Sequence, residues 1–345
     1  MTRRHDLQRG LALAACLFGL DLPGRGAEPP DYSTAILTPA TASTPQINGP
    51  SVFGVRPGSP LLYTIPATGD RPMVYAVETL PEGLTVDPRT GRITGSLSQP
   101  GTYPVTLHAR NDRGTTTRFF RIIVGEAISL TPAMGWNSWN CWARAVDGDK
   151  VLRAARAMVS SGLSRHGWTY INIDDTWEGT RSPDSHALQP NEKFSDLRAL
   201  CEKIHGLGLK AGLYSTPWIT TYAGHCGGSS DHPGGAWEPS TDKGQRFGRY
   251  SFAEADARQW AAWGFDYLKY DWAPNDLPHL VEMQAALRRS GRDIIFSVSN
   301  SAPFELAPDL ARLANSWRTT NDIRDRWAGG DPAWALGVSE IGFSQ

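Results

Sequence analysis

A single carboxylate, Asp271, directly follows an apolar run at residues 265–270 and is flanked by Lys269 and Trp272. The run is typical of a buried parallel strand, and α/β folds place their chemistry where such strands end. A cation two residues before the carboxylate favours the ionised form that a nucleophile requires. Asp271 is therefore a candidate reacting group, and the alternative is that it forms the N-cap of the next helix.

Further polar and aromatic side chains stand at the ends of other apolar runs. In chain order they are Trp136 and Trp139, Asp174 and Asp175, Tyr214, Lys269 and Asp271, Ser299, then Arg318 and Asp322. Because the carboxyl ends of parallel strands share one face of a barrel, these side chains are expected to converge on one pocket. Two carboxylates that flank a bond fit glycoside hydrolysis, in which one acts as nucleophile or base and the other as acid.

From Leu130 onward, short apolar runs alternate with segments of helix length, which is the pattern of βα units in a parallel sheet. Strands are predicted near residues 133–137, 170–174, 210–214, 265–270, 294–297 and 316–318. Helices are predicted between them, including 149–161, 195–207, 252–263 and 277–289. These six units predict a (β/α)8 TIM barrel truncated after the sixth strand, because a complete barrel takes about 250 residues and fewer remain. A different α/β fold is the alternative.

An open barrel would leave two strand edges and part of its core exposed, which favours aggregation. The sequence is therefore predicted to be a fragment of a longer protein. A soluble, cooperative, monomeric fold of these 345 residues alone would contradict that prediction.

Residues 1–27 have the pattern of a secretory signal peptide, with a basic start, an apolar stretch and small residues before Glu28. Export to the periplasm or the extracellular space is predicted. Residues 13–16 also resemble a bacterial lipobox, although the apolar run continues past Cys16, which disfavours a lipid anchor there. Removal of Cys16 leaves three widely spaced cysteines, and no disulfide framework or zinc site follows from them.

The charge of the chain is nearly balanced, with 34 basic and 35 acidic residues. Nothing in it points to a nucleic-acid partner or, through bulk charge, to a membrane surface. All 13 tryptophans lie between Trp136 and Trp334. The flat rings that can stack on sugars or fill a core therefore belong to the C-terminal part of the chain.

Residues 28–46 are predicted to be a linker rich in Pro, Thr, Ala and Ser, and residues 47–125 show strand-like alternation between turn signals. The segments LPEGLTVDPRTGRITG and GTYPVTLHARNDRG resemble the bacterial Ig-like (cadherin-like) repeat of exported proteins. The resemblance implies a β-sandwich that acts as a spacer or interaction module. An adhesion protein built around this module is one alternative for the whole chain.

Residues 128–345 carry a second resemblance. The segments TPAMGWNSWN, YINIDDTW, GLKAGLYS, DYLKYDW and WRTTNDI occur in the order of the successive motifs of the family 27 glycoside hydrolases, the α-galactosidase family. The resemblance implies that Asp271 is the nucleophile and Asp322 the general acid/base of a retaining mechanism, with the carboxyl groups about 5 to 5.5 Å apart. It implies no metal or organic cofactor.

The same resemblance implies the residues that bind the sugar. Asp174 and Asp175 match the pair that holds O4 and O6 of a terminal galactose, and Arg318 matches a contact on the O2 side. Trp139, Tyr214 and Lys269 match further sugar contacts. The carbohydrate substrate is thereby predicted to be a terminal α-galactosyl residue.

Three alternatives stay open. Small residues in FSVSNSAP, with Ser299 and Ala302 nearest to the position that faces C2 of the sugar, resemble the α-N-acetylgalactosaminidase arrangement. A catalytically inactive carbohydrate-binding fragment is the second alternative, and the adhesion protein is the third. The pair Asp174 and Asp175 argues against the arabinopyranosidase members, because it favours a hexose with an axial O4 and a free O6.

Overall fold

The computed structural model describes residues 41–242, 244–331 and 335–343. The predicted signal peptide, Cys16 and most of the predicted linker lie outside these residues, so export and the lipid anchor stay predictions. None of the described helices is long and apolar enough to cross a membrane.

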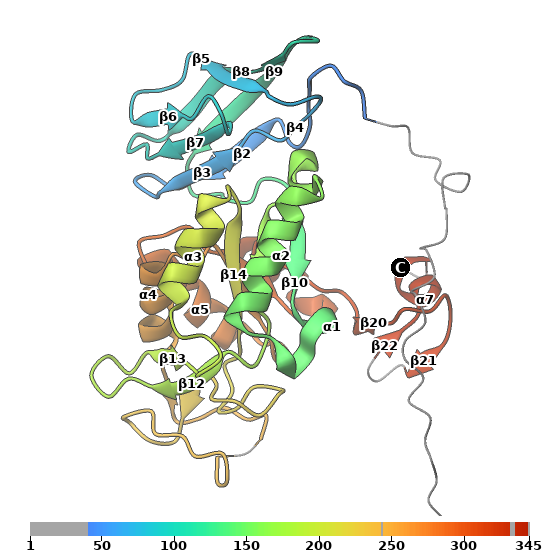
Figure 1. Ribbon diagram of the computed structural model, residues 1–345. Coiled ribbons are helices and arrows are strands. Elements are labelled where there is room, and N and C mark those ends of the chain that lie inside the picture. Colours follow the sequence, from blue (N-terminus) through green and yellow to red (C-terminus); the bar gives the residue numbers. More distant parts are fainter. Residues whose placement is uncertain (1–40, 243, 332–334, 344–345) are drawn as a thin grey trace, which may run out of the picture. The chain divides into compact units, whose positions relative to one another are not determined.

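The N-terminal part of the described chain is a β-sandwich (Figure 1). Its strands are β1 (Gln46–Ile47), β2 (Val52–Val55), β3 (Leu61–Thr64), β4 (Ala67–Thr68), β5 (Val74–Glu78), β6 (Leu84–Val86), β7 (Arg92–Gly95), β8 (Gly101–Asn111) and β9 (Gly114–Val124). Sheets of order β2-β9-β8-β5 and β3-β7-β6 enclose one apolar core. In β8 the buried residues Val105, Leu107 and Ala109 alternate with more exposed ones, as expected for a strand with one face on a core.

The C-terminal part contains a parallel sheet of order β10-β11-β14-β17-β18-β19, which follows the order of the strands in the chain. The strands are β10 (Gly135–Asn137), β11 (Tyr170–Asn172), β14 (Lys210–Ser215), β17 (Tyr267–Tyr270), β18 (Ile295–Val298) and β19 (Ser316–Trp317). All six predicted strands are confirmed, with ends shifted by one or two residues. The predicted truncation after the sixth strand stays a prediction.

Helices connect these strands and lie around the sheet (Figure 1). They are α1 (Trp139–Trp142), α2 (Gly148–Ser160), α3 (Leu197–Gly206), α4 (Ala253–Trp263), α5 (Leu277–Arg289) and α6 (Ala307–Leu313), with the 3₁₀ turns η1 (Ala143–Ala145), η2 (Leu163–His166) and η3 (Phe304–Leu306). Aspartates cap three of them: Asp147, Asp196 and Asp276 each accept a hydrogen bond from a backbone N–H of the first turn. Such caps satisfy donors that an α-helix leaves without partners, which explains where these helices begin.

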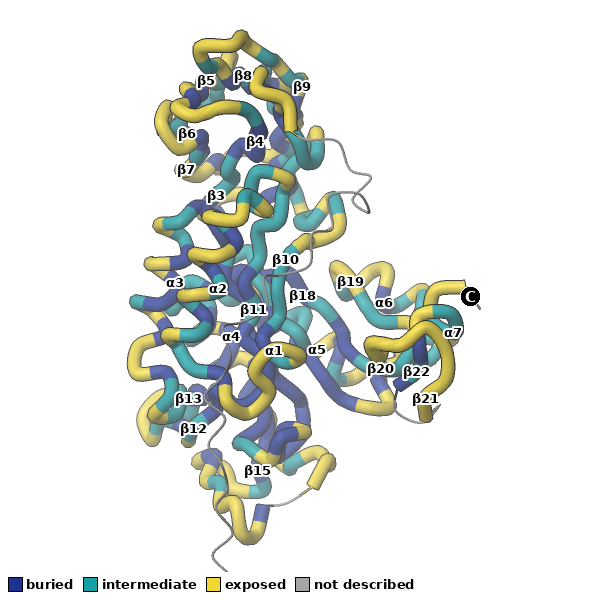
Figure 2. The backbone as a smooth tube through the Cα atoms, turned by 45° about the vertical axis from the view of Figure 1, so that its right-hand side comes forward, coloured by how far each residue is buried: buried dark blue, intermediate teal, exposed yellow. Residues whose placement is uncertain are grey.

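Short strand pairs extend beyond the carboxyl ends of the parallel strands. They are β12 (Glu178–Arg181) with β13 (Leu188–Pro190) and β15 (Ser229–Ser230) with β16 (Tyr250–Ser251). After β19 come β20 (Asp322–Ile323), β21 (Gly330–Asp331), β22 (Ala335–Leu336) and α7 (Val338–Phe343). The central strands β14 and β18 are largely buried, whereas the edge strands β10 and β19 and the later elements β20, β21 and α7 are exposed or only partly buried (Figure 2).

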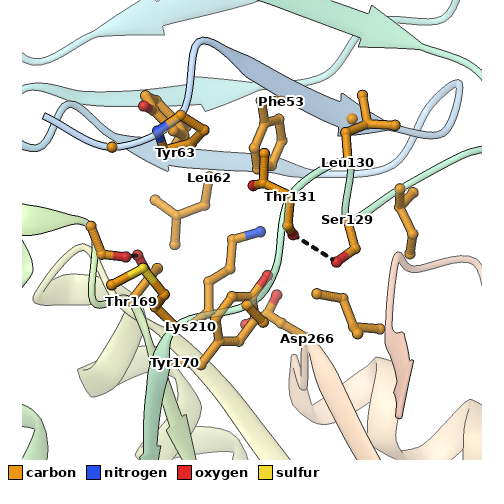
Figure 3. Close-up of a pocket in the computed structure, with 18 of the residues that line it drawn as sticks. Phe53, Leu62, Tyr63, Ser129, Leu130, Thr131, Thr169, Tyr170, Lys210 and Asp266 are labelled. Atoms are coloured by element: carbon orange, nitrogen blue, oxygen red, sulfur yellow. Dashed lines mark hydrogen bonds between the residues drawn. The ribbon is translucent and has the colours of Figure 1, made fainter. Parts of the chain in front are cut away.

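The β-sandwich contacts the amino ends of the parallel strands. Arg56 forms an ion pair of 2.6 Å with Asp293, which precedes β18, and Thr64 Oγ1 donates to Gly208 O, which precedes β14, at 2.8 Å. A cavity of about 370 Å³ lies between the two parts (Figure 3). The cavity is thus at the end of the sheet opposite to the predicted catalytic carboxylates.

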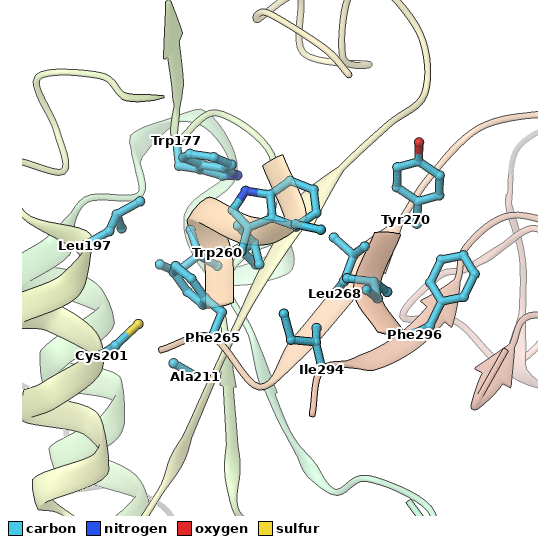
Figure 4. Close-up of a cluster of buried hydrophobic side chains, with 14 of the residues drawn as sticks. Trp177, Leu197, Cys201, Ala211, Trp260, Phe265, Leu268, Tyr270, Ile294 and Phe296 are labelled. Carbon is cyan, nitrogen blue, oxygen red and sulfur yellow. The ribbon is translucent and has the colours of Figure 1, made fainter. Parts of the chain in front are cut away.

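The core of the α/β part packs the sheet against its helices (Figure 4). Leu268 and Phe296 from neighbouring strands belong to the same cluster as Trp260 of α4, and all three are buried. Trp177 is buried beside them, and its Nε1 donates to Tyr214 O at 2.9 Å. This core fixes the positions at which the parallel strands end.

Candidate active site

The carboxyl ends of the parallel strands bring distant residues to one edge of the sheet. Tyr214 of β14 is in register with Lys269 of β17, and Lys269 is in register with Ser297 of β18. Asp271 directly follows β17, and its backbone N–H donates to Ser215 O at 2.9 Å. These strand ends therefore lie side by side, and convergence of the whole predicted set on one pocket stays a prediction.

Asp174 is the centre of a buried polar cluster. Its Oδ2 accepts a hydrogen bond from Asn137 Nδ2 at 2.7 Å and forms an ion pair with Lys269 Nζ at 2.9 Å. Its backbone N–H donates to Ser138 Oγ at 2.9 Å, and its Oδ1 accepts from the backbone N–H of Asp175 at 2.9 Å. Both carboxylate oxygens are therefore held in fixed positions beside a cation.

Asp175 and Glu178 form a second buried acidic pair. Asp175 Oδ2 accepts from the Ala223 backbone N–H, and Glu178 Oε2 accepts from the Thr176 backbone N–H, both at 2.8 Å. The other oxygen of each carboxyl group has no hydrogen-bond partner among the described residues. Burial raises the pKa of both groups, and for Glu178 the charge of Asp175 raises it further. Two buried carboxyl oxygens are thus left without a hydrogen-bond donor among the described residues.

Asp271 lies in the same region and is almost fully buried. Asn300 Nδ2 donates a short hydrogen bond to its Oδ1. Burial raises the pKa of Asp271, whereas the charge of Lys269 and the hydroxyl groups of Ser299 and Tyr214 lower it, and burial outweighs them. The predicted effect of Lys269 therefore has the right sign, but it does not decide the direction of the shift.

The alternative role of Asp271 as a helix N-cap is wrong. The N-cap of α5 is Asp276, whose side chain accepts from the backbone N–H of His279 at 3.1 Å. Asp271 lies five residues before that cap, so its carboxylate is free for another role.

Arg318 and Asp322 form a more exposed pair beside this cluster. Arg318 Nη1 lies 2.8 Å from Asp322 Oδ1, and the two side chains are 33% and 63% exposed. Arg318 Nη1 also reaches Ser299 Oγ at 3.5 Å. Ser299 is buried, so Arg318 joins the exposed Asp322 to the interior of the site.

The insert at residues 219–244, which separates β14 from α4, contributes side chains to the site. Tyr222 OH accepts from Asn300 Nδ2 at 3.2 Å, and its ring meets Trp218 edge-on at 5.1 Å. Burial, followed by the charge of Asp271, raises the pKa of Tyr222 to about 12, and the charge of Asp322 acts in the same direction. Tyr222 thus lies within electrostatic reach of both predicted catalytic carboxylates.

Aromatic residues line and support the cluster. Tyr214 is buried, with Lys269 Nζ 5.2 Å from the centre of its ring, and its hydroxyl has no hydrogen-bond partner within the described part of the chain. Trp139 begins α1 and is half-buried, and its backbone N–H donates to Asn137 Oδ1 at 2.9 Å. Trp272 is fully buried and therefore packs beneath the cluster.

Four residues of this site were not among the predicted site residues: Asn137, Glu178, Tyr222 and Asn300. Asn137 and Asn300 stand at strand ends inside quoted motifs, so the rule that selected Asp271 also applies to them. Glu178 follows the YINIDDTW segment directly, and a third acid at that spacing was a usable signal. Tyr222 offered none, because it lies in an insert with no periodic pattern.

Comparison with models of known protein families gives two matches for this chain. A model described as "Alpha galactosidase A" matches residues 131–233 and 240–331, and one described as "Putative Ig domain" matches residues 40–125. The chain belongs to the alpha galactosidase A family. Both resemblances inferred from the sequence are thereby confirmed.

Comparison with individual proteins supports the same family assignment. Alpha-galactosidase A of Cellvibrio japonicus is 37% identical over 211 residues, which are 59% of this chain and 46% of that protein. The alpha-galactosidase of Coffea arabica is 36% identical over 221 residues, 62% of this chain and 53% of that protein. The chain thus spans about half the length of the curated relatives that it matches.

Solved structures of the family also match. The structure described as a "putative alpha-galactosidase" of Bacteroides fragilis has a TM-score of 0.78 and 34% identity, and the match covers 89% of this chain and 64% of the Bacteroides chain. Alpha-galactosidase I of Mortierella vinacea has a TM-score of 0.50 and 32% identity, and the match covers 61% of this chain and 50% of the Mortierella chain. The α/β part therefore has the fold of the barrel glycosidases, and an Ig-like module precedes it.

Proposed function

We propose that the protein is a retaining α-galactosidase that removes terminal α-galactosyl residues from oligosaccharides or polysaccharides. The observation that carries this proposal is the buried cluster at the carboxyl ends of β11, β14 and β17, where Asp271 stands beside the Asp174–Lys269 ion pair. The names of the relatives support it, and the Saccharomyces cerevisiae α-galactosidase that was solved with raffinose matches 59% of this chain with a TM-score of 0.50.

In this proposal Asp271 attacks the anomeric carbon of the sugar, and Asp322 gives its proton to the leaving oxygen as the glycosidic bond breaks. The product of this step is a β-linked galactosyl ester of Asp271. Water, deprotonated by Asp322, then attacks the same carbon and releases galactose with its original α configuration. Two inversions account for the net retention.

The remaining predicted residues have binding roles in this proposal. The fixed oxygens of Asp174 and the unpartnered oxygen of Asp175 accept hydrogen bonds from O4 and O6, and Lys269 donates to the same region. Arg318 and Ser299 face the O2 side, while Tyr214 and Trp139 bound the pocket with their rings. Oriented groups of this kind fix the anomeric carbon in front of the nucleophile.

The test compares para-nitrophenyl α-D-galactopyranoside with its 2-acetamido counterpart as substrates of this chain. Release of nitrophenol from the galactoside, with α-galactose as the first anomer seen by proton NMR, is the expected result. β-Galactose as the first product would contradict the retaining mechanism. Faster hydrolysis of the acetamido sugar would contradict the galactosidase assignment.

Two alternatives have an observation of their own. The backbone N–H of Ala302 donates to Arg318 O at 3.2 Å, which places Ala302 next to Arg318. Ser299 and Ala302 both have small side chains, so a sugar with an acetamido group at C2 is the alternative substrate. An inactive carbohydrate-binding protein is favoured by the exposure of Asp322. Binding of galactose without turnover of either glycoside would support the second alternative.

Replacing Lys269 with methionine is expected to move the acid limb of the kcat/KM profile to higher pH. The reaction requires ionised Asp271, and Lys269 is the strongest of the groups that lower the pKa of Asp271. Loss of that charge raises this pKa further, so a higher pH is needed to ionise the nucleophile. The measurement is the pH dependence of nitrophenyl galactoside hydrolysis, and an unchanged acid limb would refute the role of Lys269. Lys203→Met, an exposed lysine of α3, is the control.

A further inference from the structure

The cavity between the β-sandwich and the amino ends of the parallel strands contains a lysine, Lys210, that feels the charges of Asp266 and Asp293 without forming an ion pair with either. Figure 3 shows the Lys210 side chain extending from β14 into the space bounded by Leu62, Phe53 and Thr131. The ammonium nitrogen lies 4.8 Å from the ring centre of Phe53 and 5.9 Å from that of Tyr170. No hydrogen-bond or ion-pair acceptor for it exists among the described residues.

The two carboxylates that line the cavity already have other partners. Asp266 forms an ion pair with Arg292 at 2.6 Å and accepts from the Ala211 backbone N–H at 2.9 Å. Asp293 pairs with Arg56 at 2.6 Å. Each carboxylate therefore has its own arginine, and Lys210 is the cation left over.

Three hydroxyl groups around the cavity have acceptors of their own, whereas the buried Tyr63 hydroxyl has no hydrogen-bond partner among the described residues. Thr64 donates to Gly208 O, Thr169 donates to Gly167 O, and Ser129 donates to Thr131 O. Most of the other lining side chains are aliphatic or aromatic. Lys210 is thus a single cationic donor in a largely apolar space, the composition of a site that orients a small molecule by one polar group.

We propose that this cavity binds a small organic carboxylate with an apolar body, whose carboxylate pairs with Lys210. The cavity volume of about 370 Å³ suits a ligand of that kind. Lys210 is partly buried, its ammonium forms no hydrogen bond with the described residues, and an anionic ligand would supply an acceptor in this largely apolar space. Burial also lowers the pKa of Lys210, which an anionic ligand would raise again. The site is separate from the carbohydrate site, because it lies at the other end of the parallel strands.

The test measures binding of decanoate and of 1-decanol by isothermal titration calorimetry, below the concentration at which decanoate forms micelles. Decanoate is expected to bind the chain at one site, and at least about 10-fold more tightly than decanol, since a hydrogen bond to a charged group exceeds a neutral one. Absence of decanoate binding, or equal affinities for the two ligands, would overturn the proposal.

Variants locate the site. Lys210→Met keeps most of the side-chain volume and is expected to weaken decanoate binding about 10- to 100-fold without changing decanol binding. Lys203→Met and Asp271→Asn should leave both ligands unaffected, because neither residue lines the cavity. Leu62→Trp should fill the space and abolish binding of both ligands, and it decides the question if Lys210→Met does not fold. Unaltered decanoate binding by Leu62→Trp would place the ligand elsewhere and refute the proposal.

Discussion

Replacement of Asp271 with asparagine is expected to reduce turnover of para-nitrophenyl α-galactoside by about 10⁴-fold or more, as for other enzymes that lose their nucleophile. The amide has nearly the same shape, so the cluster around Lys269 and Asn300 can persist while the covalent step is lost. Binding of galactose should be retained. If the variant turned the substrate over at a rate within about 10-fold of the parent's, Asp271 would not be the nucleophile.

Stability separates this result from unfolding. Burial raises the pKa of Asp271 in the folded state, so the folded protein binds this proton more tightly than the unfolded chain. The ionised carboxylate therefore lowers stability at neutral pH, and the penalty shrinks as pH falls through the folded-state pKa and is gone below the unfolded-state pKa. Asp271→Asn should then unfold at an equal or higher temperature than the parent at pH 7. Asp184→Asn, on an exposed turn, is the matched control for charge removal.

Azide gives a second, chemical readout with Asp271→Ala. The truncated side chain leaves room for azide to attack the anomeric carbon from the face that the carboxylate used. The carbon–nitrogen bond forms as the glycosidic bond breaks, and the product is β-galactosyl azide. Isolation of this product would identify Asp271 as the nucleophile, whereas recovery of activity without it would contradict the assignment.

The parallel strands were predictable because burial imposes a simple pattern on them. Phe265, Leu268 and Tyr270 in the run before Asp271 are buried, and β17 ends one residue before that carboxylate, as predicted. α5 was predicted with the ends that it has, Leu277–Arg289, because Asp276 and Pro278 mark its start. Local chemistry decides these features, so the sequence contains them.

The interactions inside the site were less accessible, because they depend on contacts between distant segments. Asp175 is held by the Ala223 backbone, 48 residues away in an insert without periodic pattern. The pKa of Asp271 is raised because burial outweighs Lys269, and burial cannot be read from neighbouring residues. The cavity around Lys210 was not predicted, because it exists only where the β-sandwich meets the sheet.

Replacing Asp256 with alanine is expected to give the largest loss of stability of any change considered for this protein. Asp256 of α4 forms an ion pair with Arg181 of β12 at 2.8 Å, and both side chains are only 1% exposed. Its Oδ1 also accepts from the Leu188 backbone N–H at 2.8 Å. The alanine variant leaves a buried guanidinium without a carboxylate, which costs about 3 to 5 kcal/mol. Urea unfolding measures this loss.

Two controls separate the buried charge from the loss of packing. Arg258→Ala breaks an exposed ion pair with Glu254 on the same helix and should cost less than about 1 kcal/mol. Arg181→Met combined with Asp256→Leu should recover much of the stability, since apolar residues can replace a buried ion pair. A loss below about 1 kcal/mol for Asp256→Ala itself would show that the guanidinium reaches water or another acceptor.

The same variant should weaken substrate binding, although Asp256 does not belong to the carbohydrate site. Arg181 donates to Gly227 O, and Gly227 lies on the insert that also supplies Tyr222 and the Ala223 N–H. Without Asp256, Arg181 is no longer fixed, and neither is the part of the insert that holds Asp175. KM for the galactoside should therefore rise more than kcat falls, because Asp175 binds the sugar in the proposed mechanism while Asp271 performs the chemistry. An unchanged KM in folded Asp256→Ala protein would show that the insert keeps its position without this ion pair.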